Sequence, residues 1–239
     1  MTEAGLDVRV SPLSVVAAGV RLGAGSVVEE LCLIGRHGPA APAEPPSPGG
    51  DAAADGAPHT VIGERATIRS HTVIYAGNHI GARFQTGHHI LLREANTIGD
   101  NVSVGSLSVV EHHVTIADGV RIHSQCFIPE FSVLEEGAWI GPRVTLTNAP
   151  FPQCPDVASC LRGVHVGRAA RVGANATLLP GVRIGERALI GAGAVVTRDV
   201  AAGAVVVGPA ARQVKTIDDL LCPVGLDHRP YPPLTHTPE

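Results

Sequence analysis

The sequence is poor in aromatic residues and in methionine. Phe, Trp and Tyr together make up 3% of the 239 residues, and the single methionine is residue 1. A helical core built on large side chains is therefore not expected, because such cores need aromatic and long apolar residues. The 28 glycines, with many valines and isoleucines, indicate thin strands and tight turns instead.

The sequence also lacks a strong charge of one sign and a long apolar run. Its net charge is −4 and its pI is about 6.3, so no basic surface argues for a nucleic-acid partner. No apolar run approaches the ~20 residues of a membrane span. The first seven residues lack the basic and apolar pattern of a signal peptide. We expect a soluble, cytoplasmic protein with neither a nucleic acid nor a membrane as partner.

The odd number of cysteines does not indicate a disulfide framework. The chain has five cysteines, and it is long enough to form a core without covalent staples. We expect thiols in a reducing compartment. Cys154 and Cys160 lie six residues apart, without a matching Cys or His pair nearby, so no zinc or other metal is predicted. The five residues are Cys32, Cys126, Cys154, Cys160 and Cys222.

An aliphatic residue recurs at every sixth position, with one threonine in the series. A helix does not repeat at six and a simple strand repeats at two, so each repeat is predicted to contain one short strand and one tight turn. This pattern is typical of a solenoid of parallel β-coils. The uninterrupted series is Ile62, Ile68, Ile74, Ile80, Thr86, Leu92, Ile98, Val104, Val110, Ile116, Ile122, Ile128, Leu134, Ile140 and Leu146.

Shorter series flank it, from Val10 to Ile34 and from Val166 to Val196. Proline-rich excursions are predicted at 36–59 and 149–163. The solenoid domain is expected to cover residues 1–215. A short helix from Thr216, which would cover the open end, and a proline-rich tail are expected in 216–239.

Three six-residue repeats should close one triangular coil, so that residues eighteen apart stack at ~4.8 Å. On the third side the outward residues are mostly apolar: Val73, Leu91, Val109, Phe127 and Thr145. On the second side they are mostly polar: Thr67, Gln85, Ser103, Arg121 and Trp139. Because contiguous exposed apolar surface usually marks an interface, the third side is predicted to pack against other subunits in a cyclic homotrimer.

The same column argument brings a histidine and two carboxylates together. Glu94 and Glu130 should lie one coil before and after His112, and Asn148 one coil further. Carboxylates can hold a histidine in one tautomer and stabilise it after it takes a proton. His112 is the candidate base, with Glu130, Glu94 or Glu111 as its orienting partner. The candidate substrate contacts are Asn148, His88, His89 and His123.

The pattern resembles the hexapeptide-repeat acyltransferases, which implies a left-handed parallel β-helix that is usually trimeric. The segment Val110-Glu-His-His-Val-Thr-Ile is similar to one in bacterial nucleotide-amino-sugar N-acetyltransferases, where the corresponding histidine acts as general base. The close relatives carry an acid where this chain has His113, which leaves the orienting partner open. By this resemblance we expect acetyl-CoA as co-substrate, with contacts from Gly191, Ala192, Gly193, Pro209, Ala210, Arg212 and Lys215.

The expected function is therefore acetyl-CoA-dependent N-acetylation of a nucleotide-linked amino sugar. Three alternatives stay open: O-acetylation of a sugar, a non-catalytic β-helix scaffold, and a γ-type carbonic anhydrase. The last needs three metal-binding histidines, two of them five residues apart in one coil. The candidate histidines here are adjacent, or eleven apart from His112 to His123.

Overall fold

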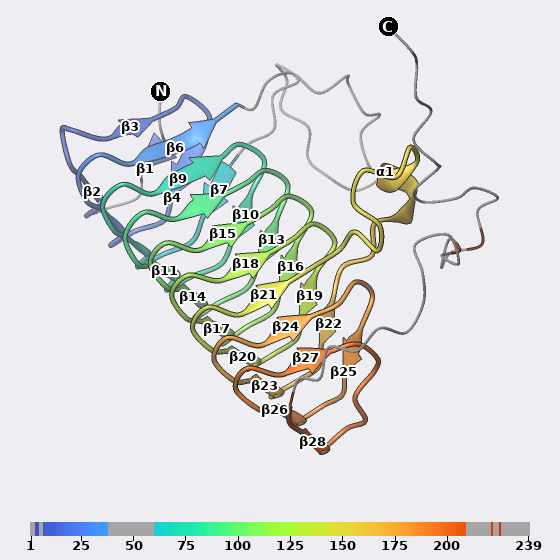
Figure 1. Cartoon of the computed structure of the whole chain (residues 1–239). Coiled ribbons are helices and arrows are strands. Elements are labelled where there is room, and N and C mark those ends of the chain that lie inside the picture. The colour runs from blue at the N-terminus through green and yellow to red at the C-terminus, as the bar shows by residue number, and fades with distance from the viewer. Residues whose placement is uncertain (1–2, 5–6, 38–59, 209–220, 222–224, 226–239) are drawn as a thin grey trace, which may run out of the picture.

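The computed structural model describes residues 3–4, 7–37, 60–208, 221 and 225. These residues wind into stacked coils, and successive strands of the chain go in turn to three parallel sheets (Figure 1). The fold is a left-handed parallel β-helix, as the sequence predicts. A short helix, α1 (Val157–Cys160), projects from its side. No helix in the described part of the chain is long and apolar enough to cross a membrane.

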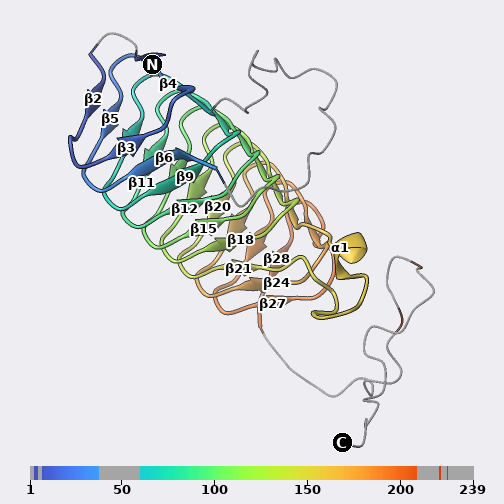
Figure 2. The same ribbon diagram turned by 90° about the horizontal axis from the view of Figure 1, so that it is seen from above.

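Each sheet takes every third strand, and Figure 2 shows the strands of the third sheet side by side. The first sheet contains β1 (Glu3–Ala4), β4 (Val20–Leu22), β7 (Thr60–Ile62), β10 (His79–Ile80), β13 (Thr97–Ile98), β16 (Thr115–Ile116), β19 (Val133–Leu134), β22 (His165–Val166) and β25 (Arg183–Ile184). The second contains β2 (Arg9–Val10), β5 (Val27–Val28), β8 (Thr67–Ile68), β11 (Gln85–Thr86), β14 (Ser103–Val104), β17 (Arg121–Ile122), β20 (Trp139–Ile140), β23 (Arg171–Val172), β26 (Leu189–Ile190) and β28 (Val205–Val206). The third contains β3 (Val15–Val16), β6 (Leu33–Arg36), β9 (Val73–Tyr75), β12 (Leu91–Leu92), β15 (Val109–Val110), β18 (Phe127–Ile128), β21 (Thr145–Leu146), β24 (Thr177–Leu178) and β27 (Val195–Val196).

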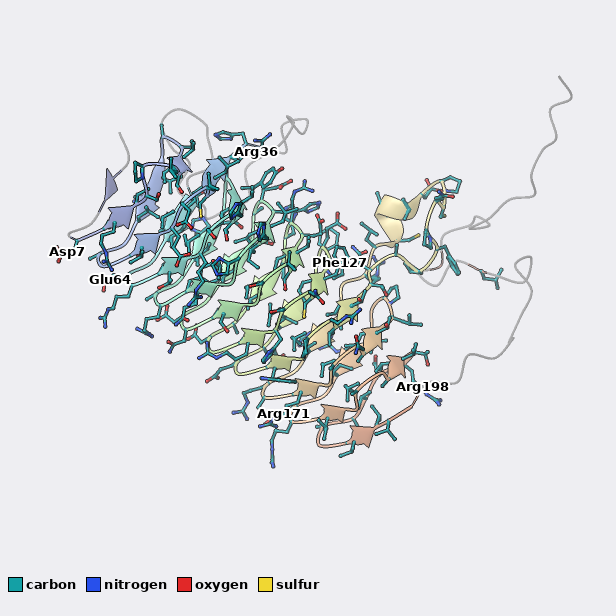
Figure 3. The ribbon with its side chains drawn as sticks, turned by 60° about the vertical axis from the view of Figure 1, so that its left-hand side comes forward. Asp7, Arg36, Glu64, Phe127, Arg171 and Arg198 are labelled. Carbon is teal, nitrogen blue, oxygen red and sulfur yellow. The ribbon has the colours of Figure 1, made fainter. Side chains whose placement is uncertain are left out.

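From β7 to β21, neighbouring strands of each sheet pair residues that are eighteen apart, which confirms the predicted columns. In the third sheet, Leu91 pairs with Val73 and with Val109. The predicted apolar stripe is therefore continuous, and Phe127 within it is exposed (Figure 3). Arg171 continues the polar stripe of the second sheet beyond Trp139, and its side chain projects away from the coils (Figure 3).

Both excursions leave the solenoid at the corner between the third and first sheets. The first follows β6, which ends at Arg36, the first residue of the predicted excursion. The second lies between β21 and β22 and contains α1, a helix that the six-residue pattern does not indicate. The predicted C-terminal helix and tail (216–239), like most of the first excursion, lie outside the described residues.

Two positions in each turn have different steric requirements. A Cβ atom on Gly63 would lie 2.6 Å from the carbonyl carbon of Gly81 in the next coil, so the close approach of coils requires glycine there. Two residues later, Arg65 adopts a left-handed conformation with φ of 56°. His89 and His113 occupy the same turn position, also with φ of 56°. The recurring glycines of the sequence indicate the position of Gly63. No residue type in the sequence marks the left-handed position of Arg65.

Two buried asparagines close the corner between the third and first sheets. The Asn78 side-chain nitrogen donates to the carbonyls of Tyr75 (2.7 Å) and Arg93 (2.8 Å). The Asn78 side-chain oxygen accepts a bond from the Asn96 backbone N–H at 3.0 Å. Asn96 repeats the pattern, donating to Arg93 and accepting from the Val114 N–H at 2.7 Å. Both asparagines are fully buried, so this ladder fixes the corner.

We expect Asn96→Val to lower the free energy of unfolding by ~1–3 kcal/mol, because the Val114 N–H loses its partner in a buried setting. Valine suits the coil, since Val114 occupies the same place one coil later. Urea denaturation of the variant and of an exposed control, Thr97→Val, measures the difference. Equal stability of the two variants would contradict the structural role of the ladder.

Candidate active site

His112 lies on the corner where the chain passes from β15 in the third sheet to β16 in the first. Its Nε2 is 2.8 Å from Oε1 of Glu130, which follows one coil later. The other carboxylate oxygen, Oε2, accepts a hydrogen bond of 2.6 Å from Nδ2 of Asn148. The His112 and Glu130 side chains are 26% and 24% exposed, so a solvent-borne substrate can reach them. The predicted stack of His112, Glu130 and Asn148 is present as one continuous series of contacts.

The other two predicted carboxylates bind an arginine that the sequence argument missed. Arg93 donates to both oxygens of Glu94 at 2.8 Å and to Glu111 at 3.3 Å. Its guanidinium lies 5.2 Å from the ring centre of Tyr75. The hydrogen bond from Arg93 is the main cause that lowers the pKa of the Glu94 carboxyl. Of the three carboxylates, Glu130 is therefore the one that contacts the His112 ring.

His113 also takes part in this cluster, although the sequence argument noted it only as a departure from the family pattern. Its Nδ1 lies 2.7 Å from Nδ1 of His112. The Phe131 ring stacks on His113 at 5.9 Å between centroids and meets His112 edge-on at 6.3 Å. Both ring nitrogens of His112 therefore have partners, Glu130 on one side and His113 on the other.

A groove begins beside this cluster, at Phe131. It has a volume of 560 Å³ and is also lined by Leu161 of the second excursion and by His165 and Arg183 of the first sheet. A second hollow of 520 Å³ shares His165 and Arg183, so the two hollows continue along the sheet. A hydrogen bond from His165 is the main cause that lowers the pKa of the Glu135 carboxyl there. The corner of His112 thus opens onto a surface large enough for a small-molecule substrate.

The candidate histidines His88 and His89 lie on a different corner, between the second and third sheets. His88 Nδ1 is 2.8 Å from the Ser70 hydroxyl, and its backbone N–H donates to the Ser106 hydroxyl. His89 stacks on His71 of the preceding coil, with ring centres 4.4 Å apart. Within one chain, the structure does not bring these histidines to His112.

His123 lies at the edge of a polar groove on the second sheet. Its ring is 4.6 Å from that of Trp139, and the groove has a volume of 480 Å³. Arg69, Gln85 and Arg121 also line it. The predicted substrate contact His123 therefore lies in a groove on the second sheet, separate from the corner of His112.

The predicted cofactor contacts fall partly within the described residues. Gly191, Ala192 and Gly193 form the turn between β26 and β27. A Cβ atom on Gly193 would meet no atom within 4 Å, so the turn is open and of low relief. A hollow of 230 Å³, lined by Arg198 among others, lies between β27 and the end of the described coils. The other four predicted contacts, Pro209, Ala210, Arg212 and Lys215, lie outside the described residues.

The four cysteines of the described residues are buried and are not suited to the role of nucleophile. Burial raises the pKa of the Cys126 thiol to about 11 and also raises that of Cys32, and the thiolate is the reactive form. Cys154 and Cys160 are buried in the second excursion. The described residues contain no group of three or more His, Cys, Asp or Glu side chains that could hold a metal.

Three solved structures illustrate the range of proteins with a similar shape. LpxA from Acinetobacter baumannii is 14% identical, with a TM-score of 0.43 over 84% of this chain and 69% of that one. A UDP-N-acetylglucosamine acyltransferase from Campylobacter jejuni is 17% identical, with a TM-score of 0.44 over 80% and 68%. A variant of GDP-perosamine N-acetyl transferase from Caulobacter crescentus, in complex with CoA and GDP-perosamine, is 18% identical. Its TM-score is 0.33 over 85% of this chain and 54% of that chain, so this chain spans about half its length.

No curated protein sequence matches this chain. A family model described as bacterial transferase hexapeptide (six repeats) matches residues 97–130 and 163–198. The first match includes His112 and Glu130, and the second includes the turn at Gly191–Gly193. The six-residue repeats within these two stretches therefore match the bacterial transferase hexapeptide model.

Proposed function

We propose that this chain is a cytoplasmic, CoA-dependent acyltransferase that moves an acetyl group from acetyl-CoA to the amino group of a nucleotide-linked amino sugar. The observation that carries the proposal is the accessible His112 ring, held by Glu130, which is in turn held by Asn148. Its place in repeats of the bacterial transferase family supports the same conclusion. We assign His112 as the centre of the general base.

The chemistry needs a base and a fixed negative charge beside it. The neutral amine attacks the thioester carbonyl, so a C–N bond forms as the C–S bond breaks. The proton lost by the amine passes to the histidine base at this corner, and the Glu130 carboxylate stabilises the resulting positive charge on the His112 ring. The CoA thiolate leaves and takes up that proton. The Asn148 amide keeps Glu130 in the position that this step requires.

We assign the pantetheine arm of acetyl-CoA to the low-relief turn at Gly191–Gly193. An extended chain can lie against exposed backbone there, because Gly193 leaves open space where a side chain would stand. The cationic residues Arg212 and Lys215 are proposed to meet the CoA phosphates. The proposal includes acetyl-CoA as co-substrate and no metal.

A homotrimer is part of the proposal. The stripe of Val73, Leu91, Val109 and Phe127 is continuous along the third sheet, and a cyclic trimer would cover it. We expect mass spectrometry from a native buffer to give three times the chain mass. Phe127→Glu should shift the mass towards that of a monomer, whereas Gln85→Glu on the second sheet should not. A monomeric native protein would contradict this part of the proposal.

The function is tested by incubating the protein with acetyl-CoA and a panel of UDP- and GDP-linked amino sugars. Release of CoA and a mass increase of the acceptor by one acetyl group are the expected results. Matched sugar nucleotides with a hydroxyl in place of the amine separate N-acetylation from O-acetylation. If neither kind of acceptor gains an acetyl group, the proposed function is wrong.

A further inference from the structure

We infer that His113, and not His112, presents the unprotonated ring nitrogen to the acceptor, and that His112 relays the proton charge from His113 to Glu130. This inference rests on the proposed function, which it deepens by naming a second histidine in the base. It makes His113 the residue that touches the substrate and makes His112 a positioning and relay residue. The contacts of the cluster lead to it in three steps.

The first step fixes the proton of His112 on Nε2. An ionised carboxylate only accepts hydrogen bonds. Oε1 of Glu130 lies 2.8 Å from His112 Nε2, while Oε2 is occupied by the Asn148 amide. His112 Nε2 must therefore be the donor. In neutral imidazole one nitrogen donates and the other accepts, so His112 Nδ1 carries the lone pair.

The second step assigns the proton of His113. Its Nδ1 is 2.7 Å from His112 Nδ1, and two lone pairs at that distance would repel each other. Because His112 Nδ1 is the acceptor, His113 Nδ1 must carry the proton. The remaining nitrogen, His113 Nε2, then holds the only imidazole lone pair of the two rings that is not already hydrogen-bonded.

The third step concerns access. His113 is exposed, whereas His112 is half-buried, and His113 Nε2 has no hydrogen-bond partner among the residues that the structure describes. Phe131 stacks on the His113 ring with an interplanar angle of 29°, which holds the ring plane. The free nitrogen is therefore both oriented and open to solvent beside the groove that begins at Phe131.

The proton path balances without any further reactant. As the amine attacks the thioester, its proton moves to His113 Nε2, and the proton on His113 Nδ1 moves to His112 Nδ1. The positive charge then lies on His112, in contact with the Glu130 carboxylate. When the CoA thiolate leaves, both shifts reverse and the thiolate takes the proton from His113 Nε2.

The charged groups around the pair favour this path. Arg93 pairs with Glu94 and Glu111, whereas Glu130 has no arginine partner in this cluster and contacts His112 instead. Glu130 contacts His112 directly, so its carboxylate stabilises the positive charge that reaches that ring during the transfer.

Ring-nitrogen NMR of the full-length protein tests the tautomers directly. With both rings uncharged, we expect the proton on Nδ1 of His113 and on Nε2 of His112. Finding the His113 proton on Nε2 would overturn the relay. This measurement needs no acceptor, so it stands apart from the proposed function.

Kinetics of His113→Asn test the catalytic use. Asparagine tolerates the left-handed turn and can still donate to His112 Nδ1, but it cannot take the proton. We expect kcat to fall by ~10²–10⁴ with little change in KM. Arg65→Asn, at the same turn position and the same φ of 56° on another corner, should leave both unchanged.

The possible failures differ. If the wild-type protein transfers acetyl groups and His113→Asn retains its kcat within a factor of about 2, the relay is wrong and His112 alone is the base. If the wild-type protein releases no CoA with any acceptor of the panel, the proposed function is wrong and the relay has no catalytic use.

Discussion

His112→Ala is expected to lower kcat for acetyl transfer by ~10²–10⁴, the range that a positioned acid–base group contributes. The variant removes the ring between Glu130 and His113, so no imidazole is left in contact with the carboxylate. Steady-state rates of CoA release with the best acceptor of the panel measure the loss. KM should change less, because the ring is not required for the ground-state complex.

The matched control is His79→Ala, which removes an exposed histidine from β10 on the first sheet. It should retain the wild-type rate. Glu130→Gln should lie between the two, because glutamine keeps the shape of the side chain but removes the charge beside the ring. A His112→Ala protein with an unchanged kcat would exclude His112 from the catalytic base.

Phe84→Ala is expected to lower the free energy of unfolding by ~3–5 kcal/mol, the cost of removing a buried aromatic side chain. Phe84 is fully buried and is the largest such side chain in the described core. Its neighbours in the column, Ala66 and Val102, are smaller, so they cannot fill the cavity. In the same coil, Thr86 stands where the six-residue series otherwise has an aliphatic residue, and the buried Phe84 ring adds apolar volume to the core of that coil.

Urea denaturation followed by far-UV circular dichroism measures this loss. Phe84→Leu should cost clearly less than Phe84→Ala, since it leaves a smaller cavity. Gln85→Ala, an exposed change at the next residue, should stay within ~0.5 kcal/mol of the wild type. An alanine variant as stable as the wild-type protein would contradict the packing described for this coil.

The six-residue series was sufficient to predict the sheets and their register. Because one coil takes eighteen residues, the sequence alone places His112, Glu130 and Asn148 in one column, and their contacts follow that column. The inward and outward positions follow from the same count. The regularity of the backbone is what made this part of the site predictable.

The other features depend on side-chain conformation, which a period cannot supply. Glu94 and Glu130 are equivalent by register, yet Arg93 binds Glu94 and leaves Glu130 to contact His112. The contact between His112 and His113 joins adjacent residues, so it lies outside an argument based on columns. Helix α1 falls in an excursion without periodic signal.

Both excursions from the solenoid occur at the corner of His112. The chain leaves after β6 and after β21, and it re-enters the first sheet at β7 and β22 with the register intact. An inserted residue within a coil would turn every later core residue outward, whereas a loop that leaves and returns at a corner shifts nothing. The length of a loop at this corner therefore does not change the register of the later coils. The surroundings of the site can be lengthened, shortened or exchanged for a new acceptor while the scaffold that positions His112 stays the same.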